Sequence, residues 1–206
     1  MSRICVITAD GRSYYTIVSK LRSAGLPFLS LLPGDDSQEC GLIITTKKEA
    51  PSFTSPTIPL EELDENPDVA RSQILSRLTE GERMMVVGID PGSRIGAAAF
   101  LGETRLASQT FNSKNGVVTW VERLLEKVPS KRLVIRIGDG DPESATWIAK
   151  EFEALVPGAA VEIVDESGTS RGGSTRGLQK DQGSAARIAF RRGIVFKKRE
   201  RNSRSF

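Results

Sequence analysis

The chain has 206 residues, of which 38% are apolar and 27% charged, and this composition predicts a core-forming protein of one large or two small domains. It contains no histidine, which excludes Ser-His-Asp and Cys-His nucleophilic sites, histidine general bases and histidine-containing metal sites. A metal site would therefore be built from oxygen ligands, which favour Mg²⁺ or Mn²⁺.

The net charge of +3 conceals an uneven distribution of charge along the chain. From residue 167 onward, 11 Lys and Arg face two acids, a net of about +9; residues 1–166 carry 18 bases and 24 acids, a net of about −6. A basic C-terminal segment favours a polyanionic partner such as nucleic acid. The alternative is a solubilising tail that has no partner.

The two cysteines predict a reduced, cytoplasmic setting. Cys5 lies in an apolar strand pattern and Cys40 in a predicted loop, so they are too few and too isolated for a disulfide framework or a zinc knuckle. No apolar run approaches the ~20 residues that cross a bilayer, and the N-terminus lacks the charged-then-apolar order of a signal peptide. We therefore expect no membrane partner.

Residues 1–82 predict a small α/β domain with a linker and a helix. Three segments have strand character: residues 3–8, 28–32 and 42–46. An amphipathic helix follows Asp10, which we interpret as its cap, and ends at Gly25 before Pro27. Asp35 and Asp36 have the pattern of turn residues. No glycine-rich phosphate loop is present, which argues against nucleotide binding.

The next segment, residues 49–65, is rich in Pro, Ser, Thr and acids and predicts a linker. Asn66-Pro67 then has the pattern of an N-cap followed by a first-turn proline, and the predicted helix runs to Gly81. These features place a domain boundary near residue 82.

A hairpin is predicted over the central stretch, residues 84–103. An apolar strand from Met84 to Ile89 ends at Asp90, turns through residues 91–93 and resumes as a second strand from Ile95 to Leu101. A carboxylate at the end of a buried strand must be solvated, paired or metal-bound, because a lone buried charge costs several kcal/mol. The alternative is that Asp90 only opens the turn.

The remaining elements complete a predicted domain over residues 83–196. Strands are expected at 104–111, 132–137 and 161–166, and helices at 115–128, 142–155 and 181–192. A hairpin that feeds parallel strands with crossover helices predicts a mixed five-stranded sheet flanked by helices. Residues 197–206 predict a basic, flexible tail.

Acids fall where the predicted strands end, at Asp90, Asp139 and Asp165-Glu166, and at the start of the last helix, Asp181. The carboxyl ends of parallel strands meet at one edge, so these carboxylates are expected to share a divalent-metal site for phosphodiester hydrolysis. Of the strand pair, only one residue would face the site. Asp139 in a Gly-Asp-Gly turn and Asp181 as a helix cap are the structural alternatives, and Asp141 is interpreted as a cap before Pro142.

Four segments together resemble the RNase H-like superfamily, in particular Holliday junction resolvases of the RuvC and YqgF types: VVGIDPGSRIGAAAF, IGDGDPESATWIAKEFEAL, VEIVDESGTS and KDQGSAARIAF, within residues 84–192. The resemblance implies an RNase H-like sheet with Asp90, Asp139, Glu166 and Asp181 as catalytic metal ligands. The strand at 132–137 departs from the RuvC pattern because its acid comes after the strand, and Ser184 stands where a second aspartate is typical.

The basic residues predict a nucleic-acid interface that grips phosphates without selecting a sequence. Its candidate residues are Arg171, Arg176, Lys180, Arg187, Arg191, Arg192, Lys197 and Lys198. The expected function is a Mg²⁺- or Mn²⁺-dependent endonuclease acting on branched DNA as a homodimer, since symmetric junction cleavage needs two active sites. The alternatives are a YqgF-like nuclease that processes ribosomal RNA precursors and a catalytically inactive nucleic-acid-binding module.

Overall fold

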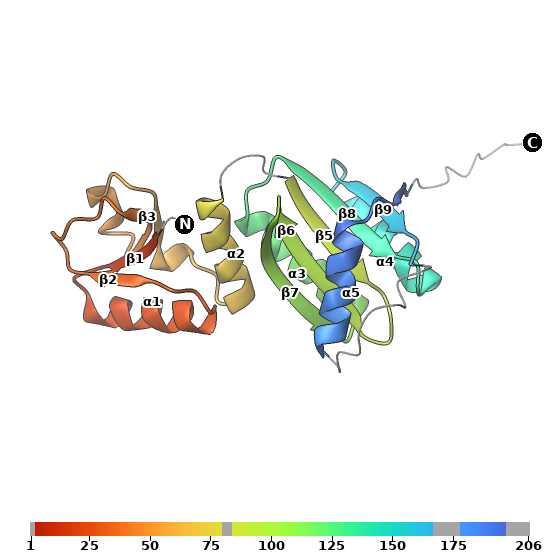
Figure 1. The fold of residues 1–206 in the computed structure, drawn as a ribbon, viewed down its shortest axis with the longest axis horizontal. Helices are drawn as coiled ribbons and strands as arrows, with labels where there is room; N and C mark the ends of the chain where they lie inside the picture. The colour runs from red at the N-terminus through yellow and green to blue at the C-terminus, as the bar shows by residue number, and fades with distance from the viewer. Residues whose placement is uncertain (1–2, 80–83, 167–177, 197–206) are drawn as a thin grey trace, which may run out of the picture. The chain divides into compact units, whose positions relative to one another are not determined.

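The computed structural model describes residues 3–79, 84–166 and 178–196 (Figure 1). The chain divides into two compact units, each with its own β-sheet flanked by helices. Residues 1–83, together with 103–107 and 123–129, form the first unit, and the remaining residues form the second. No helix in the described residues is long and apolar enough to cross a membrane.

The first unit contains a parallel sheet with the strand order β2-β1-β3-β4. Its strands are β1 (Arg3–Ile7), β2 (Leu29–Leu31), β3 (Cys40–Thr45) and β4 (Thr57–Pro59). Its helices are α1 (Gly11–Ser23) and α2 (Pro67–Leu78), with two short 3-10 helices, η1 (Ala50–Ser52) and η2 (Leu60–Glu62). The predicted α/β character of this part of the chain is confirmed.

The core of the first unit lies between its sheet and its two helices. Ile4 and Val6 of β1 pack with Ile17 and Leu21 of α1 and with Ile74 of α2. The predicted caps are confirmed because they satisfy backbone donors that a helix leaves open at its first turn. The Asp10 side chain accepts the Ser13 N–H, and the Asn66 side chain accepts the N–H groups of the first turn of α2.

The predicted linker at residues 49–65 is wrong, because this segment contains η1, β4 and η2. Ile58 of β4 pairs with Ile44 of β3 and is 3% exposed, so it belongs to the core. The strand is only three residues long and ends in Pro59, which an edge strand tolerates because the missing N–H would face away from the sheet. Its length is too short for a strand periodicity to appear in the sequence.

The two cysteines, predicted to be isolated, form a disulfide. Cys40 begins β3 and not a loop, and it lies beside β1, which carries Cys5. The Cα atoms are 5.8 Å apart, within the range that a disulfide requires. Both residues pack with Ile7 and Ile43. This cluster lies on the opposite face of the sheet from the core that the two helices cover. The cysteines therefore no longer support the prediction of a reducing compartment.

The second sheet, whose residues belong mainly to the second unit, is mixed and six-stranded, with the order β10-β9-β8-β5-β6-β7. This sheet and its helices comprise, in chain order, β5 (Met84–Asp90), β6 (Ile95–Leu101), β7 (Thr104–Phe111), α3 (Lys114–Lys127), β8 (Arg132–Gly138), α4 (Pro142–Leu155), β9 (Ala160–Val164), α5 (Leu178–Phe190) and β10 (Ile194–Val195). The predicted mixed sheet flanked by helices is confirmed. The predicted number of five strands is wrong, because β10 adds a sixth strand, antiparallel to β9.

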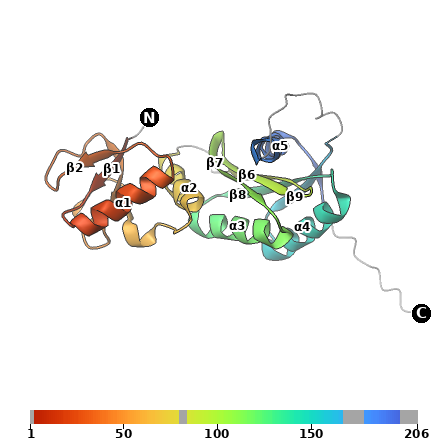
Figure 2. The same ribbon diagram turned by 90° about the horizontal axis from the view of Figure 1, so that it is seen from below.

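Helices cover both faces of this second sheet. Figure 2 shows α3 and α4 on one face and α5 alone on the other. The helix α5 approaches β5 so closely that a Cβ atom at Gly88 would lie 2.1 Å from the Ala185 carbonyl oxygen and 2.6 Å from the Ala189 nitrogen. A side chain at position 88 would push the helix off the sheet. The glycine is therefore required by a close backbone approach and not by a turn.

Candidate functional site

Three of the four predicted acids of the second unit lie at one edge of its sheet. Asp90 ends β5, Asp139 follows β8, and Glu166 lies two residues after β9. These three strands are neighbours and run parallel, with Ile89 paired to Ile137 and Gly138 paired to Val164. Their carboxyl ends therefore lie side by side, as the sequence predicted.

Glu166 sits in a space that two glycines leave open. A Cβ atom at Gly138 would lie 1.7 Å from the Glu166 Oε1 atom, and one at Gly140 would lie 3.3 Å from either carboxylate oxygen. The Gly140 N–H donates to Oε1 at 3.3 Å. Any larger residue at position 138 would displace the carboxylate. The Gly-Asp-Gly sequence, interpreted as a turn, thus serves to seat a side chain that comes 28 residues after Gly138.

Asp139 positions the chain that carries Glu166. Its Oδ1 atom accepts the Glu166 N–H at 2.9 Å, and its own N–H donates to the Val164 carbonyl oxygen at 3.1 Å. These two bonds join the end of β8 to the residues directly after β9. The structure therefore gives Asp139, predicted as a metal ligand, a role in orienting Glu166.

Asp90 projects toward the face of the sheet that α5 covers. Side chains alternate between faces along a strand, so Val86, Gly88 and Asp90 share a face. Val86 packs with Ala185 and Ala189 of α5, and Gly88 lies against the backbone of the same helix. Asp90 is half-buried at the end of this row. Glu166, over Gly138, lies on the same face, because Gly138 also meets Ile188 of α5.

The helix α5 runs antiparallel to β5. Ala185 lies beside Gly88, whereas Phe190, at the end of the helix, packs against Phe100, the register partner of Val86. The first turns of α5 therefore lie toward the Asp90 end of the strand. Asp181 is in this part of the helix. Its side chain lies outside the described residues, so its predicted place as a ligand stays a prediction.

Asp165 differs from its neighbour Glu166. Asp165 is exposed, whereas Glu166 is half-buried. The Asp165 carbonyl oxygen accepts the Arg191 guanidinium at 3.2 Å. If the alternation of the strand continues past Val164, the two side chains point to opposite faces. Of the pair, Glu166 is therefore the residue that reaches the site.

The site in its described part is not a complete metal centre. Among the side chains that the structure describes, which do not include that of Asp181, no group of three or more acidic or cysteine residues is placed to hold a metal ion. Two carboxylates, Asp90 and Glu166, supply the hard oxygen donors that Mg²⁺ and Mn²⁺ prefer. A third would have to come from the second carboxylate oxygen of Asp139, from Asp181, from water or from a substrate.

The predicted nucleic-acid residues fall partly outside the described residues: Arg171, Arg176, Lys197 and Lys198, and the side chain of Lys180. The other three follow one another along the end of α5. Arg187 and Arg192 are exposed, Arg191 is half-buried, and the Arg187 guanidinium donates to the Ser184 hydroxyl at 3.1 Å. Arg187 lies in α5, and Arg191 and Arg192 directly follow the helix, so the exposed positive charge of Arg187 and Arg192 lies near its end.

A largely buried ion pair that the sequence did not predict holds the end of α5. The Arg136 Nε atom donates to Glu162 at 2.9 Å, and the two side chains are 15% and 16% exposed. The Arg136 guanidinium also donates to the Ala189 carbonyl oxygen at 2.6 Å, and Glu162 accepts the Gly193 N–H at 3.1 Å. This network ties α5 and the chain before β10 to the middle of the sheet.

The first unit has a carboxylate at the equivalent edge of its own sheet, and the sequence analysis missed it. Glu49, in the turn after β3, accepts the Ala9 N–H at 2.7 Å, the Thr46 hydroxyl at 2.6 Å and the Thr45 hydroxyl at 3.2 Å. Burial alone would raise the pKa of Glu49, but these bonds and one from Thr8 outweigh it and lower the pKa to about 2.

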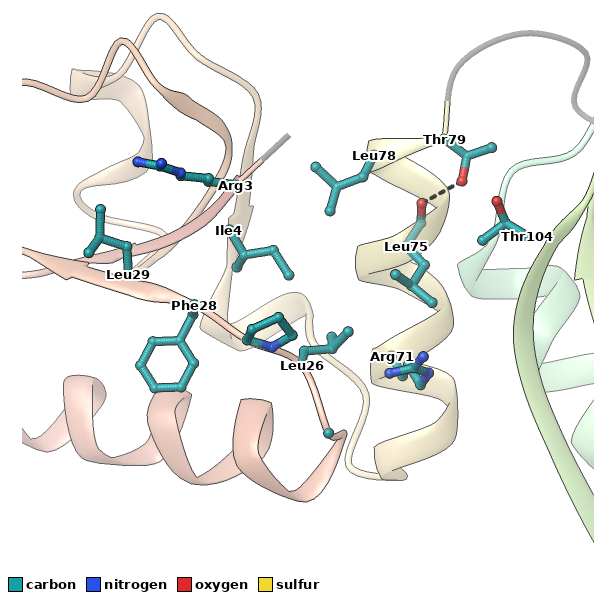
Figure 3. Close-up of a pocket in the computed structure, with 12 residues that line it drawn as sticks. Arg3, Ile4, Leu26, Phe28, Leu29, Arg71, Leu75, Leu78, Thr79 and Thr104 are labelled. Carbon is teal, nitrogen blue, oxygen red and sulfur yellow. Dashed lines mark hydrogen bonds between the residues drawn. The ribbon is translucent and has the colours of Figure 1, made fainter. Parts of the chain in front are cut away.

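The first unit also has an apolar groove of ≈ 790 Å³ between the start of its sheet and α2 (Figure 3). Leu26, Phe28, Leu75 and Leu78 are among the side chains that line it. The two arginines at the groove have partners within the unit: Arg3 pairs with Glu39, and Arg71 donates to the Ala24 carbonyl oxygen at 3.0 Å. Nothing in the structure shows what covers this surface.

A family model described as a response regulator receiver-like domain matches residues 3–78, less than half of the chain. No curated protein matches the chain. The strand order β2-β1-β3-β4 agrees with the match, because doubly wound sheets of the flavodoxin type, which include such regulators, follow the order 2-1-3-4-5.

This match corrects the family recognised from the sequence. The matching family is receiver-like and not an RNase H-like nuclease. It lies on residues for which the resemblance offered no counterpart, since the four quoted segments begin after residue 83. An apolar strand that ends in Asp-Pro-Gly describes a strand followed by a tight turn, and this geometry by itself does not identify a family.

Proposed function

We propose that residues 84–196 form a divalent-metal-dependent phosphodiesterase that cleaves structured nucleic acid, with four-way junction DNA as the favoured substrate. One observation carries the proposal: the Glu166 carboxylate is seated over Gly138, between the ends of β5 and β9, on the face toward which Asp90 projects. Carboxylates that meet at such an edge repel each other, and a bound cation relieves this repulsion.

Asp90 and Glu166 would hold Mg²⁺ or Mn²⁺, with Asp181 as the proposed third ligand. A divalent cation held by carboxylates supplies an activated water and stabilises the departing oxygen of a phosphodiester. The protein's own part is to orient the ligands. Gly138 leaves room for the Glu166 carboxylate, and Asp139 fixes the Glu166 backbone through its N–H.

The proposed partner is nucleic acid, bound through its phosphates. Arg187 and Arg192 are exposed near the end of α5, and the segment from residue 167 onward carries a net charge of about +9. Contacts of this kind follow the backbone and do not select a sequence, which suits recognition of a branched shape. A homodimer belongs to the proposal, since two symmetric cuts need two sites.

The finer fold prediction for this unit, an RNase H-like arrangement, belongs to the same proposal and not to a family assignment. Its support is the order of the strands, in which the antiparallel strands β5, β6 and β7 are extended by the parallel strands β8 and β9. The arrangement of α3 and α4 on one face and α5 on the other also supports it (Figure 2).

A nucleic-acid-binding module without catalysis is the second candidate. The observation that favours it is that the described residues contain no group of three ligands for a metal ion. Processing of an RNA precursor is the third candidate and would use the same carboxylates. Substrate choice separates the two enzymes, and turnover separates either enzyme from the module.

The test is cleavage of a four-way DNA junction, a linear duplex and a structured RNA by the full chain, in Mg²⁺ or Mn²⁺ and under single-turnover conditions. We expect junction cleavage that Asp90→Asn and Glu166→Gln each reduce by roughly 1,000-fold, the loss typical of a preorganised catalytic group. Asp165→Asn is the matched control, since this carboxylate is next in sequence but exposed, and it should leave the rate unchanged.

Each alternative result has a distinct meaning. Cleavage of RNA but not of the junction would replace the favoured substrate with the RNA precursor. Binding that weakens steeply with salt but shows no turnover in Mn²⁺ would favour the module. Junction cleavage that survives Asp90→Asn and Glu166→Gln would overturn the site.

A further inference from the structure

The carboxylate of Glu49 occupies a position that is built to bind an anion. It accepts hydrogen bonds from the Ala9 N–H at 2.7 Å, from the Thr46 hydroxyl at 2.6 Å and from the Thr45 hydroxyl at 3.2 Å. The two threonines are at most 9% exposed. Buried hydroxyls and a backbone N–H that point at one spot form a site for an oxyanion, because each donor would otherwise be left without a partner at a cost of ~1–3 kcal/mol.

A simpler explanation, a helix-capping box, accounts for only part of this geometry. Thr46 and Glu49 have the spacing of such a box, and the Glu49 N–H does approach the Thr46 hydroxyl, at 3.3 Å. In a capping box, however, the glutamate reaches back to the backbone N–H of the capping residue. Glu49 instead reaches the Ala9 N–H, 40 residues earlier in the chain, in the segment that follows the neighbouring strand β1.

The position of this carboxylate is the usual ligand position of the fold. Ala9 follows β1, and Thr45 and Thr46 end and follow β3. In the order β2-β1-β3-β4, the direction of winding changes between β1 and β3, and ligands of doubly wound sheets bind in the crevice outside the carboxyl ends of the strands at that point. Glu49 thus lies where an exogenous ligand would be expected.

We infer that the carboxyl edge of this receiver-like unit is a binding site for a small oxyanion, and that the chain fills it with its own Glu49 side chain. The unit consequently holds, without any ligand, the arrangement of β1 and β3 loops that a bound carboxylate or phosphate would impose. Soluble phosphate does not switch it, since the site is taken. This role is separate from the proposed hydrolysis in the second unit and does not depend on it.

The test is to remove the internal anion and offer one from solution. The variant Glu49→Ala, in the full chain, should have a melting temperature roughly 4–8 °C below that of the wild type. Sodium acetate or inorganic phosphate, compared with chloride at equal ionic strength, should raise the melting temperature of the variant by several degrees more than that of the wild type. The Ala9 amide resonance should shift with the added anion in the variant alone.

Two further variants serve as controls. Glu61→Ala removes a carboxylate that also accepts a backbone N–H, from Lys47 at 2.9 Å, but on the exposed surface, so it should show no response to acetate. Glu49→Gln keeps the volume of the side chain and should also show none. An acetate response of Glu49→Ala equal to that of the wild type would overturn the inference. If Glu49→Ala unfolds in chloride, recovery of folded protein in acetate supports the site, and failure in both salts counts against it.

Discussion

Each unit has a glutamate carboxylate at the carboxyl edge of its sheet, but the groups around the two carboxylates differ. Glu49 is surrounded by hydroxyl and N–H donors, which lower its pKa to about 2. Glu166 accepts the Gly140 N–H at 3.3 Å and lies over Gly138, on the same face as another carboxylate, Asp90. Neutral donors satisfy a carboxylate within the protein, whereas neighbouring carboxylates favour a cation. The same fold element therefore produces a closed structural site in one unit and a candidate reactive site in the other.

The largest effect should come from taking away the space that Glu166 needs. Gly138→Ala would bring a Cβ atom to 1.7 Å from the Glu166 Oε1 atom, so the carboxylate must leave its place. If the proposed hydrolysis is correct, junction cleavage should fall roughly 1,000-fold, as when a preorganised catalytic group is removed. Single-turnover rates of the variant and the wild type in Mn²⁺ measure this effect.

Gly140→Ala is the graded control for that experiment. A Cβ atom there would lie 3.3 Å from the Glu166 carboxylate oxygens, which a small movement can accommodate. We expect a loss of cleavage of roughly tenfold or less. Equal losses in the two variants would show that the whole turn is disturbed, and would contradict a specific role for Gly138 in seating Glu166.

The next largest effect should come from breaking the ion pair between Arg136 and Glu162, which holds the end of α5 against the second sheet. Arg136→Ala would leave Glu162 charged and largely buried, and removal of one partner from such a pair costs ~3 kcal/mol in the free energy of unfolding. Urea unfolding followed by the fluorescence of Trp120 and Trp147, both in the second unit, measures it. The double variant Arg136→Met, Glu162→Leu should recover most of the loss. If it unfolds as easily as Arg136→Ala, burial of an unpaired charge is not the cause.

Elements with strong local signals were predictable in both units. The helix predicted over residues 142–155 is confirmed to the residue as α4, because Asp141 caps it and Pro142 fits its first turn. The strands β4 and β10 were not predictable. With three and two residues, they show no periodicity, and pairing with β3 and β9 alone makes them strands.

The site residues were predictable only where the local sequence marks the end of a strand. An acid after an apolar run marked Asp90 and Glu166, and the parallel order of β5, β8 and β9 places both residues at one edge of the sheet. The role of Gly138 depends on a side chain far along the chain, and the role of Glu49 depends on Ala9, 40 residues before it. Contacts of this kind leave no local pattern in the sequence.

The smallest effect is a dependence of stability on pH that comes from Glu49, at the carboxyl edge of the first sheet. A carboxyl whose pKa is lowered on folding contributes stability above its ordinary pKa of 4.5, and this contribution is lost as the pH falls toward about 2. At pH 7, Glu49→Gln should therefore be less stable than the wild type by ~1–2 kcal/mol, a value reduced to allow for solvent screening of a partly exposed group.

The difference between Glu49→Gln and the wild type should shrink steadily below pH 4.5, and melting temperatures measured from pH 7 to pH 2 would follow it. A ¹³C NMR titration of the Glu49 carboxyl measures the pKa directly. Glu61→Gln, at an exposed carboxylate, should show little dependence of this kind. A Glu49 carboxyl that titrates near 4.5 would mean that the Ala9, Thr45 and Thr46 donors do not hold the anion, and the contrast between the two edges would be lost.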